Sequence, residues 1–397
     1  MTDILIEGGQ SLFRGELVEA PLTVVDGRIA EVGGGTGQRA AVAIDARGLL
    51  TLPGIVDLHG DAFERQMMPR PGVDFPIDVA LIDSDRQLIA NGITTAFHGV
   101  TWSWEPGLRG TENAHALVDA VEGLRPRLAA DTHVHLRHET FNLDAEATIV
   151  YWIKSKRISL LAFNDHMSLT VLNPAKPEKR AQMAQRTGLS LEAFNQLVDK
   201  VAGRAGEVPA SIARLAAISN AANVPMLSHD DETPKQRRGF RDLGVRVAEF
   251  PVTEDTAREA VAAGEFTVLG APNVVRGGSH TGWISATDMV RKGLCTILAS
   301  DYYYPAMLLA AFRLVAENVL PLPKAWELIS AAPAAAAGLT DRGQLATGRR
   351  ADIILVDAAQ ALRPRIVAVI AAGKLVHIGE ADRLSLQASR TPEIAAA

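Results

Sequence analysis

Leu52-Pro-Gly-Ile-Val-Asp-Leu-His-Gly-Asp61 is the most informative stretch of this sequence. The apolar run that begins at Ile55 follows a Pro-Gly pair, which predicts a short buried strand. Side chains two apart on a strand point to the same face, so Asp57, His59 and Asp61 form one polar row. Imidazole and carboxylate groups bind divalent metals, and burying them without a partner is costly. The stretch predicts either half of a metal site or a hydrogen-bonded histidine beside a loop aspartate.

Seven more apolar runs follow this strand and alternate with helical stretches. The eight runs are 55–59, 94–100, 133–139, 158–166, 224–229, 245–250, 266–272 and 295–301. Alternation of this kind is typical of parallel βα units, and eight units predict a TIM barrel. The long interruption at 168–208 is rich in Lys, Arg, Gln and Glu. We expect it to be a helical insertion over the barrel mouth, or else a solvated surface helix.

The two ends of the chain have a different sequence pattern from the middle. Short strand-like runs and tight turns fill residues 1–52, and similar runs return at 351–357 and 366–376. We therefore expect a β-sandwich domain built from 1–52 and 342–390, with the barrel spanning 53–341. The predicted fold class is α/β, a (β/α)8 TIM barrel with a small β-sandwich domain from both termini.

Composition limits the classes of function. The formal charge is −6, which gives no reason to expect nucleic acid or an anionic membrane as a partner. The single cysteine, Cys295, excludes an intramolecular disulfide and a cysteine-based zinc cluster, and it suits a cytoplasmic location. We see no signal peptide and no apolar run of transmembrane length. A small-molecule substrate is the expected partner, and the sequence leaves the oligomeric state open.

Polar side chains gather where the predicted strands end, which is where TIM barrels carry their chemistry. They lie at 59–61, 135–139, 164–166, 228–231, 272–280 and 300–302. The chain has ten histidines, and several of them fall in these segments. Each one alone is better explained as a core histidine. Taken together, they predict a metal site with ligands from separate strands.

Several segments also carry a family resemblance. They are 52–59 with 69–73, 91–95, 135–139, 165–166, 227–231, 248–251, 270–280, 300–302 and 348–354, of which 270–280 is the most specific. On these segments the chain resembles the amidohydrolase superfamily, which combines a barrel with a β-sandwich from both termini. Within that superfamily it is similar to the α-D-ribose 1-methylphosphonate 5-triphosphate diphosphatases of the carbon–phosphorus lyase pathway.

The resemblance implies five metal ligands, namely His59, Asp61, Glu139, His166 and His229. The first two would hold one ion, the glutamate would bridge two ions, and the last two histidines would hold a second ion. Asp301 would contact the attacking water and take its proton. Zinc is the expected metal, manganese and iron also suit these ligands, and the sequence leaves open whether one or two ions bind.

A separate segment suggests how an anionic substrate is held. Arg276, Gly277, Gly278, Ser279 and His280 follow the seventh strand and offer a guanidinium, backbone N–H groups and a hydroxyl. These groups suit a phosphate near strands seven and eight, where this fold often binds one. The alternative is a tight turn with a surface arginine. Arg70, in the loop after the first strand, is a weaker candidate.

One departure from the diphosphatase pattern affects the choice of substrate. The segment 165–176 lacks the glutamine- and arginine-bearing run that usually follows the Asp-His pair. Basic residues at 176, 179, 180, 235, 237 and 238 either replace the missing anion contacts or form solvated helix faces. The main hypothesis is a metal-dependent hydrolase that releases pyrophosphate from a ribose 5-triphosphate. The alternatives are a C–N hydrolase or deaminase acting on a cyclic amide or aminated ring, and a non-catalytic scaffold.

Overall fold

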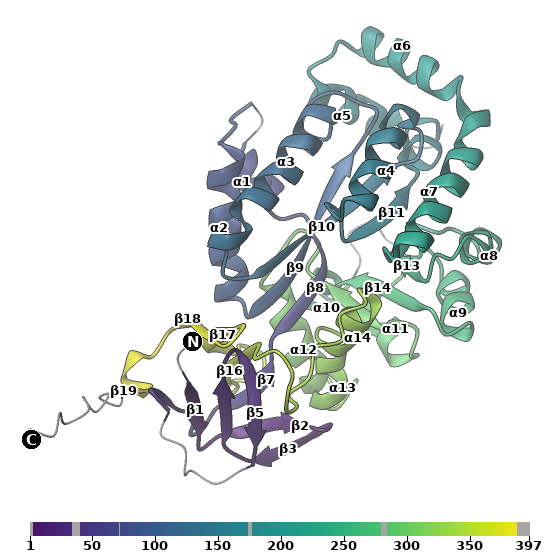
Figure 1. Ribbon diagram of the computed structural model, residues 1–397. Coiled ribbons are helices and arrows are strands. Elements are labelled where there is room, and N and C mark those ends of the chain that lie inside the picture. Colours follow the sequence, from purple (N-terminus) through teal and green to yellow (C-terminus); the bar gives the residue numbers. More distant parts are fainter. Residues whose placement is uncertain (1–2, 34–39, 71, 174–176, 279–283, 387–397) are drawn as a thin grey trace, which may run out of the picture.

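The computed structural model describes residues 3–33, 40–70, 72–173, 177–278 and 284–386 (Figure 1). Eight parallel strands form one sheet in chain order. They are β8 (Ile55–Gly60), β9 (Ile93–Trp102), β10 (Asp131–Glu139), β11 (Leu160–Asn164), β12 (Met226–His229), β13 (Val247–Glu249), β14 (Phe266–Gly270) and β15 (Ile297–Ala299). A parallel bridge between Gly60 and Asp301 joins the last strand to the first. The predicted TIM barrel is confirmed, and each of the eight apolar runs overlaps one of its strands.

Helices cover the outside of this sheet. They are α2 (Ile77–Ala90), α3 (Thr111–Leu124), α4 (Glu146–Lys154), α7 (Val208–Ala222), α8 (Pro234–Asp242), α9 (Glu254–Ala262), α10 (Ala271–Arg276), α11 (Ala286–Arg291), α12 (Ala306–Ala316), α13 (Leu322–Glu327) and α14 (Ala331–Ala336). Short side-chain caps set several of the starts. Thr233 and Thr253 each accept a hydrogen bond from the backbone N–H three residues on, which satisfies a helical donor that would otherwise lack a partner.

The two ends of the chain form two further sheets. One has the order β19-β6-β1-β4-β5 and the other β18-β17-β16-β7-β2-β3. Their strands are β1 (Ile4–Glu7), β2 (Gln10–Phe13), β3 (Glu16–Glu19), β4 (Leu22–Val25), β5 (Arg28–Val32), β6 (Val42–Asp45), β7 (Leu50–Pro53), β16 (Ile353–Asp357), β17 (Arg365–Ala371), β18 (Lys374–Ile378) and β19 (Leu384–Leu386). Each sheet contains strands from both ends of the chain, since β16 pairs with β7 and β19 with β6. A shared core that includes Ile6, Val24 and Val367 lies between them. This confirms the sandwich, while its boundaries at residues 52 and 342 remain a prediction.

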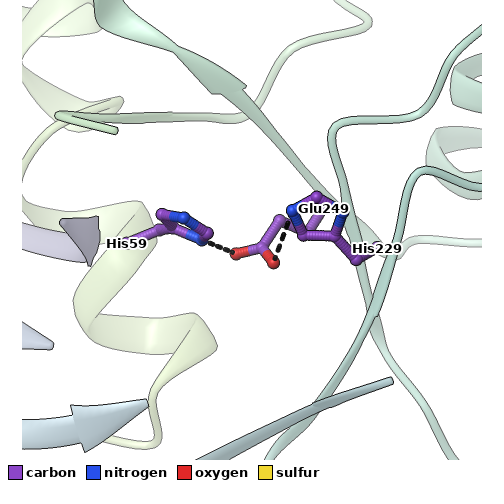
Figure 2. Close-up of side chains that lie close together, drawn as sticks. All are labelled: His59, His229 and Glu249. Atoms are coloured by element: carbon purple, nitrogen blue, oxygen red, sulfur yellow. Dashed lines mark hydrogen bonds and ion pairs between the residues drawn. The ribbon is translucent and has the colours of Figure 1, made fainter. Parts of the chain in front are cut away.

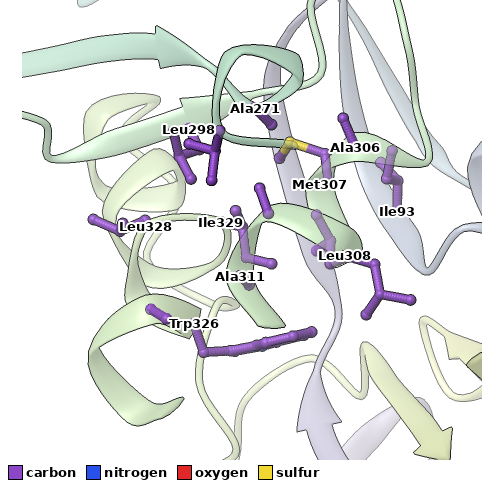
Figure 3. Close-up of a cluster of buried hydrophobic side chains, with 14 of the residues drawn as sticks. Ile93, Ala271, Leu298, Ala306, Met307, Leu308, Ala311, Trp326, Leu328 and Ile329 are labelled. Atoms are coloured by element: carbon purple, nitrogen blue, oxygen red, sulfur yellow. The ribbon is translucent and has the colours of Figure 1, made fainter. Parts of the chain in front are cut away.

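A large apolar cluster joins the barrel to its last helices. Figure 3 shows Met307 and Ala311 of α12, Trp326 of α13 and Leu298 of β15 as members of this cluster. The indole N–H of Trp326 donates to the Pro53 carbonyl oxygen at 3.1 Å, so the same residue also contacts the segment that enters the barrel. This packing holds β8 and β15 at the seam of the barrel.

The predicted insertion is helical. It contains a π-helical turn (Met167–Val171), α5 (Pro177–Thr187) and α6 (Leu191–Ala202), with α1 (Glu64–Met67) in the separate loop after β8. In Figure 1, α6 lies at the end of the molecule opposite the sandwich. Its Phe194 and Val198 are buried against Phe141 and Met167, which follow β10 and β11. The insertion therefore packs on the loops at the carboxyl ends of the strands. Among the described residues, no helix is both long and apolar enough to cross a membrane.

Candidate metal centre

The carboxyl ends of the strands surround a cavity of about 250 Å³. It is lined by His59, Arg137, His229, Asp230, Phe250, Pro251, Leu269, Gly270, Pro272, Asn273, Ile284, Asp301 and Tyr302. Three groups of metal-binding side chains occur here, each with ligand atoms within 4.8 Å of one another. The groups are His59, His229 and Glu249; His166, His229 and Asp230; and His59, Asp61 and Asp301. The structure thus brings together five of the six residues predicted to act on metal or water, and adds Glu249 and Asp230.

Glu249 fixes the orientation of His59. Its Oε1 lies 2.7 Å from His59 Nδ1, and both side chains are fully buried (Figure 2). Burial alone would lower the pKa of His59, but the charge and hydrogen bond of Glu249, together with the charge of Asp61, raise that pKa above its ordinary value. With Nδ1 held by the carboxylate, Nε2 is the nitrogen left for a metal, as in many metal-bound histidines.

The second carboxylate oxygen of Glu249 also favours a bound cation at this site. Oε2 is buried, has no hydrogen-bond partner among the described residues, and lies 3.9 Å from His229 Nε2 (Figure 2). A buried carboxylate oxygen without a partner is costly, and a divalent ion would satisfy it. Imidazoles and carboxylates around one cavity are also the donors that such ions prefer. The residues present therefore fit a divalent metal site.

Glu139 forms a second carboxylate–histidine pair. Its Oε1 lies 2.5 Å from His166 Nδ1, and its Oε2 accepts a hydrogen bond from the His166 backbone N–H at 3.1 Å. The charge of Glu139 raises the pKa of His166. Burial alone would raise the pKa of Glu139, yet the charge and hydrogen bonds of His166, together with the charge of Arg137, lower it to about 2. Among the described residues, Glu139 belongs to none of the three ligand groups, and in this arrangement it orients His166. A bridging role for Glu139 remains a prediction.

The two ring nitrogens of His229 face a carboxylate and a guanidinium. Its Nδ1 lies 3.2 Å from Asp230 Oδ2, and its Nε2 lies 3.2 Å from Nη2 of Arg137. The other end of the guanidinium, Nη1, lies 3.3 Å from Asp61 Oδ2. Arg137 is on the row of β10 that also carries His135 and ends at Glu139. A buried arginine thus stands among the candidate metal ligands.

Asp301 faces the cavity from the loop after β15. Burial raises its pKa to about 6, and the nearby charge of Asp61 adds to the effect. Its backbone has a positive φ of 55°, an uncommon conformation for a non-glycine residue that often marks a functional site. The geometry is compatible with contact to a water held by His59 and Asp61.

The predicted anion segment has a different local structure from the one expected. Arg276 ends α10, and Gly277 takes the left-handed conformation that closes a helix. The N–H groups of Gly277 and Gly278 donate to the carbonyl oxygens of Val274 and Asn273. These N–H groups bond within the helix end, so among the described residues of this segment the Arg276 guanidinium is the group left to bind an anion. Ser279 and His280 lie outside the described residues.

The Arg276 side chain is exposed and reaches the cavity wall. Its Nη1 lies 3.4 Å from the hydroxyl of Tyr302, which lines the cavity. Arg65, which the sequence did not suggest, lies over the ring of the same tyrosine at 5.5 Å. Arg70 is exposed, forms a bridge with Val73, and does not line the cavity.

The basic residues after β12 have other partners. Arg237 is completely buried and bonds to Asp231 and to the Val245 carbonyl oxygen. Arg238 is exposed and pairs with Glu259, and Lys235 is exposed on the same helix. Among the described residues, those of α8 do not line the cavity. The Lys176 position and the Lys179 side chain lie outside the described part of the chain.

A parallel barrel with these histidine and carboxylate groups at the mouth defines a metal-dependent hydrolase, and the chain belongs to the amidohydrolase superfamily. It is 31% identical over 361 residues to the α-D-ribose 1-methylphosphonate 5-triphosphate diphosphatase of Escherichia coli (strain K12), covering 89% of this chain and 94% of that protein. It is 25% identical over 419 residues to an adenine deaminase of Brucella suis biovar 1 (strain 1330), but these span only 61% of the deaminase, against 98% of this chain.

Solved structures agree on the fold. A prolidase in complex with N-methylphosphonate-L-proline has a TM-score of 0.63 and 17% identity, with 95% of this chain and 100% of that chain covered. At this level of identity the similarity concerns the architecture alone. No family model matches the chain.

Proposed function

We propose that this protein is a phosphoanhydride hydrolase that releases pyrophosphate from a ribose 5-triphosphate carrying a phosphonate. The observation that carries the proposal is the position of Arg65 and Arg276. Both contact Tyr302, which lines the same cavity as His59 and Asp301. Two exposed guanidinium groups beside a metal site suit a triphosphate chain, because arginine binds phosphate oxygens with paired hydrogen bonds. The similarity to the diphosphatase supports the same substrate class.

His59, Asp61 and Asp301 are the residues that would hold the metal, and Glu249 would orient His59. A bound divalent ion would supply Lewis-acid activation of water near neutral pH. Asp301 would then accept the proton of the attacking water and pass it to the pyrophosphate leaving group. The arginines at Tyr302 would hold the terminal phosphates, and the cavity walls would limit the entry of further water.

A second candidate is hydrolysis of a C–N bond. Phe250, Leu269 and Ile284 give the cavity apolar surface that suits a flat ring. The similarity to adenine deaminase supports this candidate. The same Asp301 would then act on water that attacks carbon. The two candidates differ in their products, so one assay separates them.

The test is a substrate panel on metal-reconstituted protein, scored for release of pyrophosphate, phosphate and ammonia. We expect pyrophosphate from ribose 5-triphosphate compounds. Arg276→Ala and Arg65→Ala should each raise KM for these compounds roughly ten- to a hundredfold, the effect of losing a charge-assisted contact of about 1.5–3 kcal/mol. Arg238→Ala is the matched control, because Arg238 is an exposed arginine paired with Glu259 away from the cavity. Ammonia release, or unchanged KM in both cavity variants, would refute the proposal.

A further inference from the structure

Arg137 lies in the middle of the candidate metal centre. It is 5% exposed, and Gly99 on the neighbouring strand β9 gives its side chain room. A Cβ atom at Gly99 would lie 3.2 Å from Arg137 Cδ and 3.5 Å from His59 Nε2. The missing side chain on β9 therefore allows the arginine and the histidine to sit side by side. A guanidinium is a cation that carries only hydrogen-bond donors, so Arg137 places a positive charge inside the centre.

The Arg137 guanidinium donates a hydrogen bond to His229 Nε2, whose lone pair would otherwise be free to bind a metal. Arginine carries only donors, so the 3.2 Å contact makes His229 Nε2 the acceptor from Arg137 Nη2. A metal on that nitrogen would lie about 2.1 Å away along the lone pair. Because Nη2 is 3.2 Å from this nitrogen, the metal would be only about 1.1 Å from Nη2, which is far too close for two separate atoms. An ion and this guanidinium cannot occupy the position together.

A complete ligand group remains on the other side of the arginine. Asp61 uses Oδ2 for Arg137 and has a second oxygen, and it lies within 4.8 Å of donor atoms of His59 and Asp301. We infer that the centre holds one divalent ion at this group, and that Arg137 takes the second metal position as a resident cation. Arg137 occupies this position whichever bond the enzyme cleaves, so the inference does not depend on the proposed substrate.

Metal content tests this directly. We expect purified, dialysed wild-type protein to contain one equivalent of divalent metal per chain by elemental analysis. Arg137→Ala and the volume-conserving Arg137→Met should raise this to two equivalents, because both free the His229 lone pair. Arg238→Ala, which removes an exposed arginine, should stay at one. In manganese-loaded samples, electron paramagnetic resonance should show an isolated ion in the wild type and a spin-coupled pair in the Arg137 variants.

Two equivalents in the wild-type protein would overturn the inference without any variant. A single equivalent in a folded Arg137 variant, with its Tm measured alongside, would overturn it as well. If one variant fails to fold, the other variant and the wild-type content still decide the question.

Discussion

Replacing Glu249 by glutamine isolates its effect on His59. The glutamine amide has almost the same volume as the carboxylate, but it carries no charge. Its oxygen can still accept the hydrogen bond from His59 Nδ1–H, which is 2.7 Å long in the wild-type protein. Removing a carboxylate that supports a metal-binding histidine typically lowers metal affinity 10- to 100-fold, or about 1.4–2.8 kcal/mol. Both groups are almost completely buried, so solvent provides little screening and we expect the upper half of that range.

The assay is competition for metal between the apoprotein and a chelator of known affinity. Glu265→Gln is the matched control, because Glu265 is another buried glutamate and pairs with Arg241 and Arg237 outside the cavity. The control should lower Tm and leave metal affinity unchanged. A Glu249→Gln protein that binds metal within about threefold of the wild type would refute the role assigned to Glu249.

The same pair sets a pH dependence in the apoprotein. Burial alone would lower the pKa of His59, but Glu249 raises it above the ordinary value of 6.5. The stabilisation from the pair is therefore full below about pH 6.5 and is lost as the pH rises through the raised pKa. The Tm difference between wild type and Glu249→Gln, measured without metal, should shrink as the pH rises. A constant difference from pH 6 to pH 9 would contradict the charge on His59.

Three further variants test other parts of the molecule. His229→Ala should leave the metal content at one equivalent, because Arg137 and not a metal occupies its Nε2; loss of metal by elemental analysis would contradict this arrangement. Asp301→Asn should keep most of the metal while kcat falls roughly 10²–10⁴-fold; an unchanged kcat would place the base elsewhere. Asp131 bonds to Arg342 at 2.5 Å, so Asp131→Asn should cost about 1.5–3 kcal/mol in chemical denaturation. Burial would raise the pKa of Asp131, but His133 and Arg342 lower it below 3.8, so this stabilisation is present above about pH 3.8 and is lost as the pH falls further. Equal stability of the two proteins at pH 7 would refute that estimate.

The barrel could be predicted because its strands are buried on both faces. Parallel strands of this kind are nearly continuous apolar runs, so β11 and β14 stand out from the polar helices around them. Their order follows from chain connectivity, since successive parallel strands are usually neighbours. The helical insertion at 168–208 was also predictable, but its π-helical turn at Met167–Val171 leaves no clear mark in the sequence.

The candidate site was only partly predictable, because its contacts depend on strand register. Glu249 ends the inward row of β13 after Val247, and the register places it beside His229. A glutamate at the end of such a row was the available signal, but its bonding partner His59 is on β8, and only the closed barrel brings the two together. In the same way Glu139 pairs with Asn164, which puts His166 two residues further on and within reach of its carboxylate.

The glycines after α10 show a second limit. Gly277 and Gly278 suit both an anion-binding turn and a helix end, since both uses exploit left-handed backbone conformations. A helix of only six residues, Ala271–Arg276, carries too weak a periodic signal to favour the second use. In the structure, the N–H groups of Gly277 and Gly278 donate to the carbonyl oxygens of Val274 and Asn273, so these glycines close the helix.

Barrel closure and the metal centre depend on the same few residues of β8. Asp57 begins the polar row that ends in Asp61, yet its carboxylate accepts the Ser300 N–H at 2.9 Å and the Ser300 hydroxyl at 2.6 Å. A Cβ atom at Gly60 would lie 2.7 Å from Asp57 Oδ2, so a glycine is needed where the two strands meet. The backbone then bonds Asp61 N–H to the Asp301 carbonyl oxygen at 2.9 Å. Asp61 and Asp301 are 240 positions apart in the sequence, and they come together only when the last strand closes on the first. The centre therefore forms with the closed barrel, and a variant that opens this seam should lose metal binding together with stability.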